Sequence, residues 1–286
     1  MSSAYLAFYL HIAILFSVTF VHYRALHRSL LSLDLRDACA GLLLLGCFML
    51  GVFSPLAAAA GLLLIILARF QPRLGGYQQG IVTGLLALWC LVLVTHQIPG
   101  FARPTLLHNV IISAGQAPFN LSLGLDKAFV GAILFIYLMP SGRPGMGSWL
   151  WTALLSAAAI ILLAVVLGVR IDIKVGTYLL WFIPVNLFIT CLAEEMFFRK
   201  IVQDNMNKLF GPHIFGATLA VLVTSYLFIL AHNIVYPEST VAILYAAASL
   251  LYALVYQYSK RVELAILTHF MVNLAHILLL PYPLYP

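Results

Sequence analysis

Apolar runs long enough to cross a lipid bilayer recur along this chain from one end to the other. The run from Tyr178 to Ala193, for example, contains no charged residue. A helix needs about 20 mostly apolar residues to cross the hydrocarbon core, and we count about ten runs that approach this length. We therefore predict an all-α, polytopic transmembrane helical bundle of about 8–10 spans.

Composition supports a membrane protein and argues against a nucleic-acid-binding one. The chain is 63% hydrophobic and only 8% charged, whereas a soluble domain has about 25% charged residues. The net charge of +6 could suggest nucleic acid as a partner. The basic residues, however, are spread over short loops between apolar runs, which is typical of membrane proteins. We expect no nucleic-acid partner.

Some features mark where the spans end. Prolines predict a linker that interrupts the helices over residues 99–124. Asp126 and Lys127, just after this linker, look like charges at the membrane interface. We expect the helix that carries Glu194 to continue through Lys200–Leu209 and to project beyond the membrane.

Two adjacent carboxylates, Glu194 and Glu195, follow the apolar run, and Arg199 comes four residues after the second. Carboxylates within a membrane-spanning helix are costly, so they need partners or a function. Residues four apart share a helix face, so Glu195 and Arg199 can form an ion pair. Glu194 points about 100° away from Glu195 and has no obvious partner in the same helix. Bridges to neighbouring helices and a role in chemistry are both open for the two acids.

Two further polar clusters lie on later apolar runs. Phe228 and His232 are four residues apart, as are His269 and Asn273, so each pair lies on one helix face. A single intramembrane histidine is most often a helix–helix hydrogen-bonding group. Three clusters together supply a carboxylate, two imidazoles and an amide, which favours a chemical role. The predicted spans that carry them are near 178–198, 214–235 and 263–280.

The ordered set of clusters resembles the three-motif signature of the CPBP family. These are intramembrane endopeptidases of the CAAX-protease and bacteriocin-processing type, also called the type II CAAX or Abi family. The resemblance covers roughly residues 178–280 and implies an intramembrane endopeptidase with its active site in the C-terminal half. We expect one integral membrane domain over 1–286, with N-terminal accessory spans in 1–123 and a CPBP-like protease core in 124–286.

The resemblance also implies a division of roles. Glu194 would act as the general base that activates a water molecule, with His232 helping to hold that water. His269 and Asn273 would donate hydrogen bonds to the developing oxyanion. The residues expected to support the site structurally are Glu195, Arg199 and Phe228.

A zinc ion is the alternative to a metal-independent reaction. Glu194, His232 and His269 could bind zinc and leave the fourth position to water. The chain has no His-Glu-x-x-His motif, however, and an asparagine such as Asn273 is a poor zinc ligand. We therefore expect no cofactor, with zinc bound by those three residues as the alternative.

The family's substrates are membrane-proximal peptides, and the compact, Leu- and Ala-rich chain favours a bacterial origin. Because bacteria generally lack protein prenylation, we expect a membrane-associated leader or a C-terminal tag as the substrate. Expected partners are membrane lipids, a membrane-anchored or lipidated substrate and, for a tagged substrate, a protein-sorting partner. The expected location is the bacterial cytoplasmic (inner) membrane.

Two other functions compete with the protease. One is a non-proteolytic scaffold or immunity protein of the same family, which has no need for all four polar residues together. The other is a proton-coupled transporter, which also uses intramembrane Glu and His. Transporters are often built from repeated halves with broken helices, and no such repeat is found in the sequence.

Overall fold

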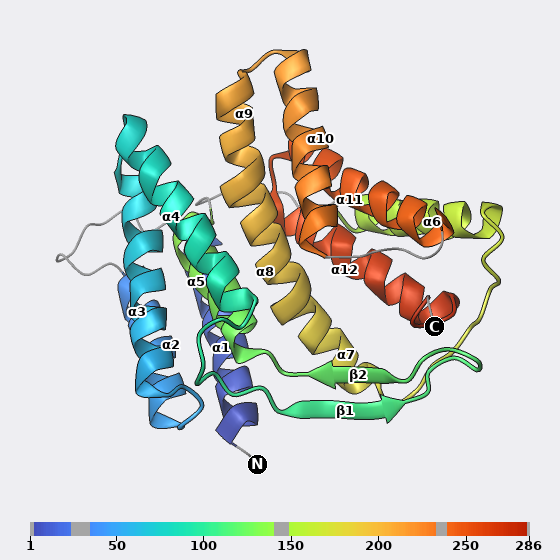
Figure 1. The fold of residues 1–286 in the computed structure, drawn as a ribbon, viewed down its shortest axis with the longest axis horizontal. Coiled ribbons are helices and arrows are strands. Elements are labelled where there is room, and N and C mark those ends of the chain that lie inside the picture. Colours follow the sequence, from blue (N-terminus) through green and yellow to red (C-terminus); the bar gives the residue numbers. More distant parts are fainter. Residues whose placement is uncertain (1–2, 24–34, 140–148, 233–238, 285–286) are drawn as a thin grey trace. The chain divides into compact units, whose positions relative to one another are not determined.

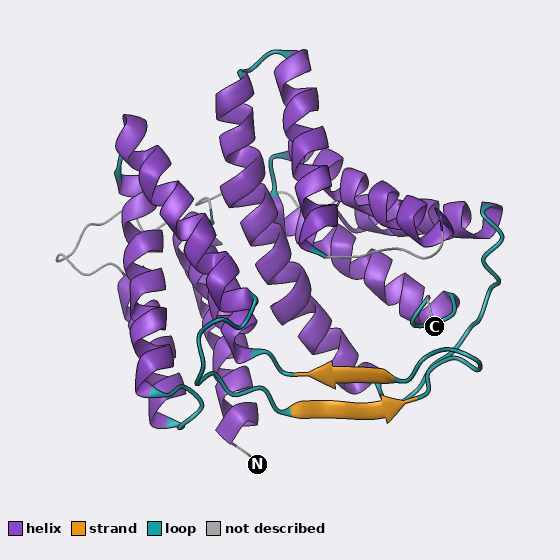
Figure 2. Cartoon of the chain, in the orientation of Figure 1, coloured by secondary structure: helices purple, strands orange, loops and turns teal. Residues whose placement is uncertain are grey.

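The computed structural model describes residues 3–23, 35–139, 149–232 and 239–284. Most of this part of the chain is helical, with one pair of short strands (Figure 2). Seven of the described helices are long and apolar enough to cross a membrane. They are Pro55–Arg73, Gly76–Val94, Trp149–Val166, Leu179–Phe210, Ile214–Ala231, Ser239–Ser259 and Val262–Leu279. The protein is an integral multi-pass membrane protein, and the predicted polytopic helical bundle is confirmed. Positions 233–235 of one predicted span lie outside the described residues.

Residue contacts divide the chain into two compact units, each made of separate stretches of sequence. The first unit comprises Met1–Pro104, Leu123–Pro144 and Phe188–Phe197. The second comprises Thr105–Ser122, Gly145–Leu187 and Phe198–Pro286. The single domain over 1–286, and its division into 1–123 and 124–286, stay predictions.

The first unit is organised around one short, deeply buried helix, α5 (Figure 1). Twelve of the fourteen residues of α5 are buried, as expected for a helix that is surrounded on all sides. It packs against α1, α2, α3, α4 and the short helix α8. The bounds are α1 Ser3–Tyr23, α2 Leu35–Met49, α3 Pro55–Phe70, α4 Gly76–Val94, α5 Leu125–Leu138 and α8 Leu192–Glu195.

Local sequence explains the start of α3. The Ser54 side chain accepts a hydrogen bond from the backbone N–H of Ala57 at 3.2 Å, and Pro55 occupies the first helical position. Serine is a favoured N-cap, and proline at the first position loses no helical hydrogen bond. Gly100 lies against this cap, because a Cβ built there would lie 1.9 Å from Ser54 Oγ. The tight corner therefore requires glycine at residue 100.

An ion pair joins α2 and α3 in the first unit. Arg69 Nη2 lies 2.7 Å from Asp37 Oδ2. The Tyr137 hydroxyl of α5 donates to the other oxygen of Asp37 at 2.8 Å. A buried carboxylate needs such partners, so Asp37 ties three helices of the unit together.

The second unit contains α6 and α10–α12, together with the flanking parts of the long helix between α6 and α10. Helix α6 packs against α12 and α11, α11 packs against α12, and α10 packs against α9 and α11. The bounds are α6 Trp149–Val166, α7 Leu179–Val185, α9 Asp204–Phe210, α10 Ile214–Ala231, α11 Ser239–Ser259 and α12 Val262–Leu279.

The predicted linker over residues 99–124 contains a β-hairpin that the sequence did not indicate. Strands β1 (Thr105–Val110) and β2 (Phe119–Ser122) pair antiparallel, with Thr105 opposite Ser122 and Val110 opposite Phe119 (Figure 2). Proline cannot donate to a strand ladder, and the prolines of the linker lie outside both strands. The same residues that interrupt the helices thus leave two short segments able to pair.

One continuous helix of 32 residues runs from Leu179 to Phe210, so the predicted extension through Lys200–Leu209 is confirmed. At about 1.5 Å per residue this helix is longer than the hydrocarbon core. It is not a regular α-helix, because π-helical segments at Asn186–Cys191 and Met196–Gln203 flank α8. Pro184 lies two residues before the first of them, and proline removes a helical hydrogen bond. Such π segments are frequent at functional sites.

Candidate active site

Glu194 lies in the first unit, on α8, and its charge has a partner on another helix. Lys127 Nζ, at the start of α5, lies 2.6 Å from Glu194 Oε1. The Glu194 side chain is only 12% exposed. A buried carboxylate is costly unless it is paired, and Lys127 supplies a positive partner for Glu194 from another helix. The sequence indicated only an interfacial charge at Lys127, and the structure shows what that charge contacts.

The first turn of α5 fixes the position of Lys127. Asp126, the residue before it, is 2% exposed and accepts a hydrogen bond from the Lys127 backbone N–H at 2.8 Å. The other carboxylate oxygen of Asp126 forms a short contact with Nδ1 of His96. Through its two carboxylate oxygens, Asp126 therefore links the backbone of Lys127 to His96.

A close contact of backbones brings α5 and α8 together next to this ion pair. A Cβ built on Gly131 would lie 3.0 Å from the Cα of Ala193. Small residues let membrane helices approach closely, and Gly131 is the position where α5 has no side chain in the way. Gly131 follows Lys127 by one helical turn, and Ala193 directly precedes Glu194.

The other two residues of the first motif are deeply buried. Glu195, in the first unit, and Arg199, in the second, are both 0% exposed. Arg199 Nη1 donates to Gln203 Oε1 at 3.0 Å. The Gln203 amide in turn donates to the carbonyl of Ala253 on α11 at 3.0 Å. The ion pair between Glu195 and Arg199 stays a prediction.

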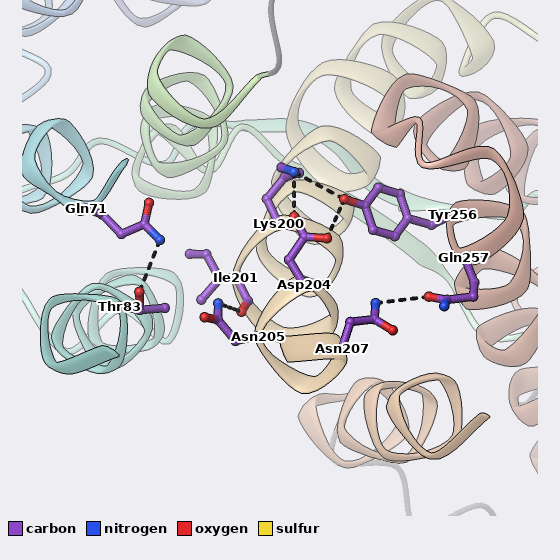
Figure 3. A network of polar contacts seen from close by, with 9 residues as sticks. All are labelled: Gln71, Thr83, Lys200, Ile201, Asp204, Asn205, Asn207, Tyr256 and Gln257. Atoms are coloured by element: carbon purple, nitrogen blue, oxygen red, sulfur yellow. Dashed lines mark hydrogen bonds and ion pairs between the residues drawn. The ribbon is translucent and has the colours of Figure 1, made fainter. Parts of the chain in front are cut away.

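Further polar contacts fasten the helix beyond Arg199 to α11 within the second unit (Figure 3). The Lys200 ammonium lies 2.5 Å from Asp204 Oδ2, and the Tyr256 hydroxyl donates to Asp204 Oδ1 at 2.8 Å. One turn on, Asn207 Nδ2 donates to Gln257 Oε1 at 3.0 Å. Lys200 also contacts the Tyr256 hydroxyl at 3.2 Å, so these contacts hold the helix from Lys200 to Asn207 against α11.

The His232 ring, just past the end of α10, is held by its own helix. Its Nδ1–H donates to the carbonyl of Phe228 at 2.7 Å. In the neutral imidazole the lone pair is then on Nε2. The ring also stacks on Phe228, with 4.5 Å between centroids and 28° between planes. Tyr245 of α11 lies at 5.2 Å on another side.

Phe228 contacts both His232 and His269 within the second unit. Its ring meets the His269 ring edge to face at 5.9 Å and 67°, while His232 stacks on it. His269 is 5% exposed and stacks on Tyr252, with 4.5 Å between centroids and 19° between planes. Aromatic packing therefore sets the planes of both imidazoles.

Asn273 is oriented by another amide. Its Nδ2 donates to Oδ1 of Asn186 at 3.3 Å, and Asn186 is the first residue of a π-helical segment. His269 and Asn273 both line a cavity of about 110 Å³ in the second unit, large enough for water. Its other walls are Ile160, Ile161, Phe228, Val241, Leu244, Tyr245, Ala248, Tyr252, Val272, His276, Leu280 and Leu284. The cavity therefore combines hydrogen-bonding groups with a mostly apolar lining.

Several contacts around these side chains were not predicted, although the sequence holds weak signals for them. Tyr245 and Tyr252 are seven residues apart and so lie on one face of α11. Asn186 is an amide within the apolar run Tyr178–Ala193. Lys127 stands at the start of an apolar run, where a charge is unremarkable. The sequence does not indicate which residue each of them contacts, and the structure shows these contacts.

The zinc alternative needs several donor groups close together. Among the residues that the structure describes, no three His, Cys, Asp or Glu side chains come together in a group able to hold a metal ion. The metal-independent reaction and the zinc alternative both stay predictions.

Comparison with known proteins identifies the segment that holds these side chains. Residues 176–275 match the family model described as type II CAAX prenyl endopeptidase, Rce1-like. This agrees with the family recognised from the motifs. All of the motif residues from Glu194 to Asn273 fall inside the match. No curated protein and no solved structure matches the chain.

Proposed function

We propose that this chain, whose residues 176–275 match the Rce1-like type II CAAX prenyl endopeptidase model, is an active intramembrane endopeptidase. One observation carries the proposal: the matched segment contains a complete set of groups for peptide hydrolysis. That set comprises Glu194, His232, His269 and Asn273. A chain that had kept only the fold would not need all four of these polar groups together, because polar groups are costly inside a membrane.

In the proposed reaction Glu194 is the general base. Its carboxylate takes a proton from a water molecule as the water oxygen bonds to the scissile carbonyl carbon. His232 holds this water through Nε2, which carries the lone pair when Nδ1–H donates to Phe228. When the tetrahedral intermediate collapses, the carbon–nitrogen bond breaks, and the proton held by Glu194 passes to the leaving amine. The products are a carboxylic acid and an amine, which exchange a proton to become a carboxylate and an ammonium.

His269 and Asn273 are the proposed oxyanion donors. Donors fixed in advance stabilise the negative charge that develops on the carbonyl oxygen. Support comes from the stacking of His269 on Tyr252 and from the hydrogen bond of Asn273 to Asn186, because both restrict movement. Glu195, Arg199 and Phe228 are assigned structural support of the site.

The proposed substrate is a membrane-anchored or lipidated peptide segment, such as a leader or a C-terminal tag. A multi-pass protein with a buried base acts most readily on a bond that the substrate brings to the membrane. The proposed location is a bacterial cytoplasmic membrane, with lipids and a sorting protein as further partners.

A cleavage assay in native membranes tests the proposal. Wild type, Glu194→Gln and His269→Ala are expressed beside a panel of tagged membrane substrates, with equal insertion verified for each. The matched controls are Glu263→Gln and His213→Ala, because His213 is exposed and Glu263 lies in the first turn of α12. We expect cleavage by wild type and both controls, and its loss in the two site variants.

Other outcomes would favour the competing functions. Cleavage that persists in Glu194→Gln would rule out the glutamate as the base. Cleavage by none of the proteins would favour the scaffold or immunity protein. Proton-coupled flux in vesicles that disappears in Glu194→Gln would favour the transporter.

A further inference from the structure

We infer that Lys127 is a positioning residue for Glu194, holding its carboxylate in one place and supplying its counter-charge. The inference rests on the proposed function, since only there does Glu194 act as a base. Lys127 Nζ lies 2.6 Å from Glu194 Oε1, and the two side chains are 29% and 12% exposed. Lys127 lies outside the matched segment 176–275, so the match assigns it no role.

The contacts that hold the backbone of Lys127 in place support a positioning role. Asp126 accepts a hydrogen bond from the Lys127 backbone N–H and is itself in contact with His96. Helix α5 is buried along nearly its whole length, so the start of the helix has little freedom to move. A lysine whose backbone is held in this way presents its ammonium at a defined point, although the side chain itself is flexible.

The backbone next to Glu194 is also held in place by α5. The carboxylate follows Ala193, whose backbone lies against Gly131 of α5. Gly131 lies one turn beyond Lys127, on the same face of α5. Two neighbouring points thus connect α5 with α8: a backbone contact and the ion pair. The ion pair is the one that reaches the carboxylate.

Charge explains why a lysine is useful here. An ionised carboxylate away from water is stabilised by a nearby positive charge, and removing one partner of a buried pair leaves the other uncompensated. Without Lys127, the Glu194 carboxylate would lose this counter-charge and the contact that fixes its direction. The carboxylate would then be less well placed to accept a proton from water.

A simpler explanation is that the ion pair only stabilises the packing of two helices. Another ion pair in the same unit allows a matched comparison. Arg69 and Asp37 lie 2.7 Å apart and are 31% and 8% exposed, so their geometry and burial resemble those of Lys127 and Glu194. A purely structural role predicts similar effects on turnover when either ion pair is broken. Positioning of the base predicts an effect on turnover only for Lys127.

The test compares Lys127→Met, Lys127→Arg and Arg69→Met with wild type in the cleavage assay, with kcat and KM measured separately. We expect Lys127→Met to lower kcat at least tenfold and to change KM less than twofold. Lys127→Arg should restore most of the loss, because arginine keeps the positive charge, and Arg69→Met should stay within twofold of wild type. Wild-type kcat in Lys127→Met, no rescue by arginine, or an equal loss in Arg69→Met would each overturn the inference.

A double-mutant cycle separates failure of this inference from failure of the proposed function. Thermal unfolding in detergent is measured for wild type, Lys127→Met, Glu194→Gln and the double variant. We expect the two single effects not to add, because each removes the same ion pair. Additive effects would overturn the inference even if wild type cleaves substrate. Non-additive effects in a chain that cleaves no substrate would instead contradict the proposed function and give the Lys127 ion pair a structural role only.

Discussion

Asn186 and Asn273 are 87 residues apart in the sequence and are joined by an amide–amide hydrogen bond of 3.3 Å. The donor is Nδ2 of Asn273 and the acceptor is Oδ1 of Asn186. Asn273 is one of the proposed oxyanion donors, while Asn186 begins the π-helical segment Asn186–Cys191. The amide plane of a proposed catalytic residue is thus set by the helix that carries the two carboxylates.

This bond predicts that Asn186→Ala slows cleavage although Asn186 has no assigned chemical role. The loss of one hydrogen bond is worth about 1 kcal/mol, which corresponds to roughly a fivefold lower kcat if the donor loses its orientation. The measurement is kcat in membranes, with Asn205→Ala as the control. Asn205 Nδ2 donates to the carbonyl of Ile201 in its own helix, so its loss should leave kcat unchanged. Equal kcat for Asn186→Ala and wild type would contradict the prediction.

The contact of Gly131 with Ala193 predicts that Gly131→Ala destabilises the protein. The added Cβ would lie 3.0 Å from the Ala193 Cα, and overpacking of this kind costs about 1–3 kcal/mol. Cleavage should fall as well, because α5 carries Lys127. The control is Gly84→Ala in α4, where a Cβ meets nothing within 4 Å. That variant should be neutral or more stable, since alanine favours helix by up to about 1 kcal/mol over glycine. Equal unfolding temperatures for both variants would refute the prediction.

Asp172 predicts a stability change in acid. It lies in the loop between α6 and α7, and a hydrogen bond from the Ser113 hydroxyl, helped by Lys174 and Arg170, lowers its pKa. In the unfolded chain an aspartate titrates near pH 3.9. The stabilising effect is therefore complete above that value and is lost as the pH falls through the lower folded-state pKa.

The measurement is the unfolding temperature of wild type and Asp172→Asn from pH 6 to pH 2.5. The difference between them should be largest at pH 6 and should shrink below about pH 4. A difference that is constant over the whole range would show that the Asp172 charge does not stabilise the fold.

Metal removal gives the fourth prediction. If Glu194 activates water without a metal, cleavage should survive prolonged treatment with EDTA within about twofold. The expected reason is chemical: the carboxylate itself accepts the proton. Complete loss of cleavage that is restored by added zinc would instead support zinc bound by Glu194, His232 and His269, with water as the fourth ligand.

The sequence predicts those parts of the site that depend on spacing within one helix. His269 and Asn273, four residues apart, do line one cavity, and Phe228 does stack on His232. Contacts between distant segments could not be predicted, because nothing in the apolar pattern around Lys127 indicates that α5 packs on α8. The β-hairpin was missed because its strands of six and four residues are too short to stand out in a proline-rich linker. The roles of the motif residues stay predictions.

The π-helical segments on either side of α8 also bear on how this helix tolerates changes in length. A π turn bonds each residue to the fifth along the chain rather than the fourth, so it accommodates one residue more than an α turn. If one residue were lost from Asn186–Cys191 or Met196–Gln203, the π turn would tighten to an α turn, and the helix beyond it would keep its direction. For Glu194, flanked by both segments, a deletion inside a π segment would therefore leave the carboxylate pointing the same way, whereas a deletion in α8 just before it would turn it by about 100°.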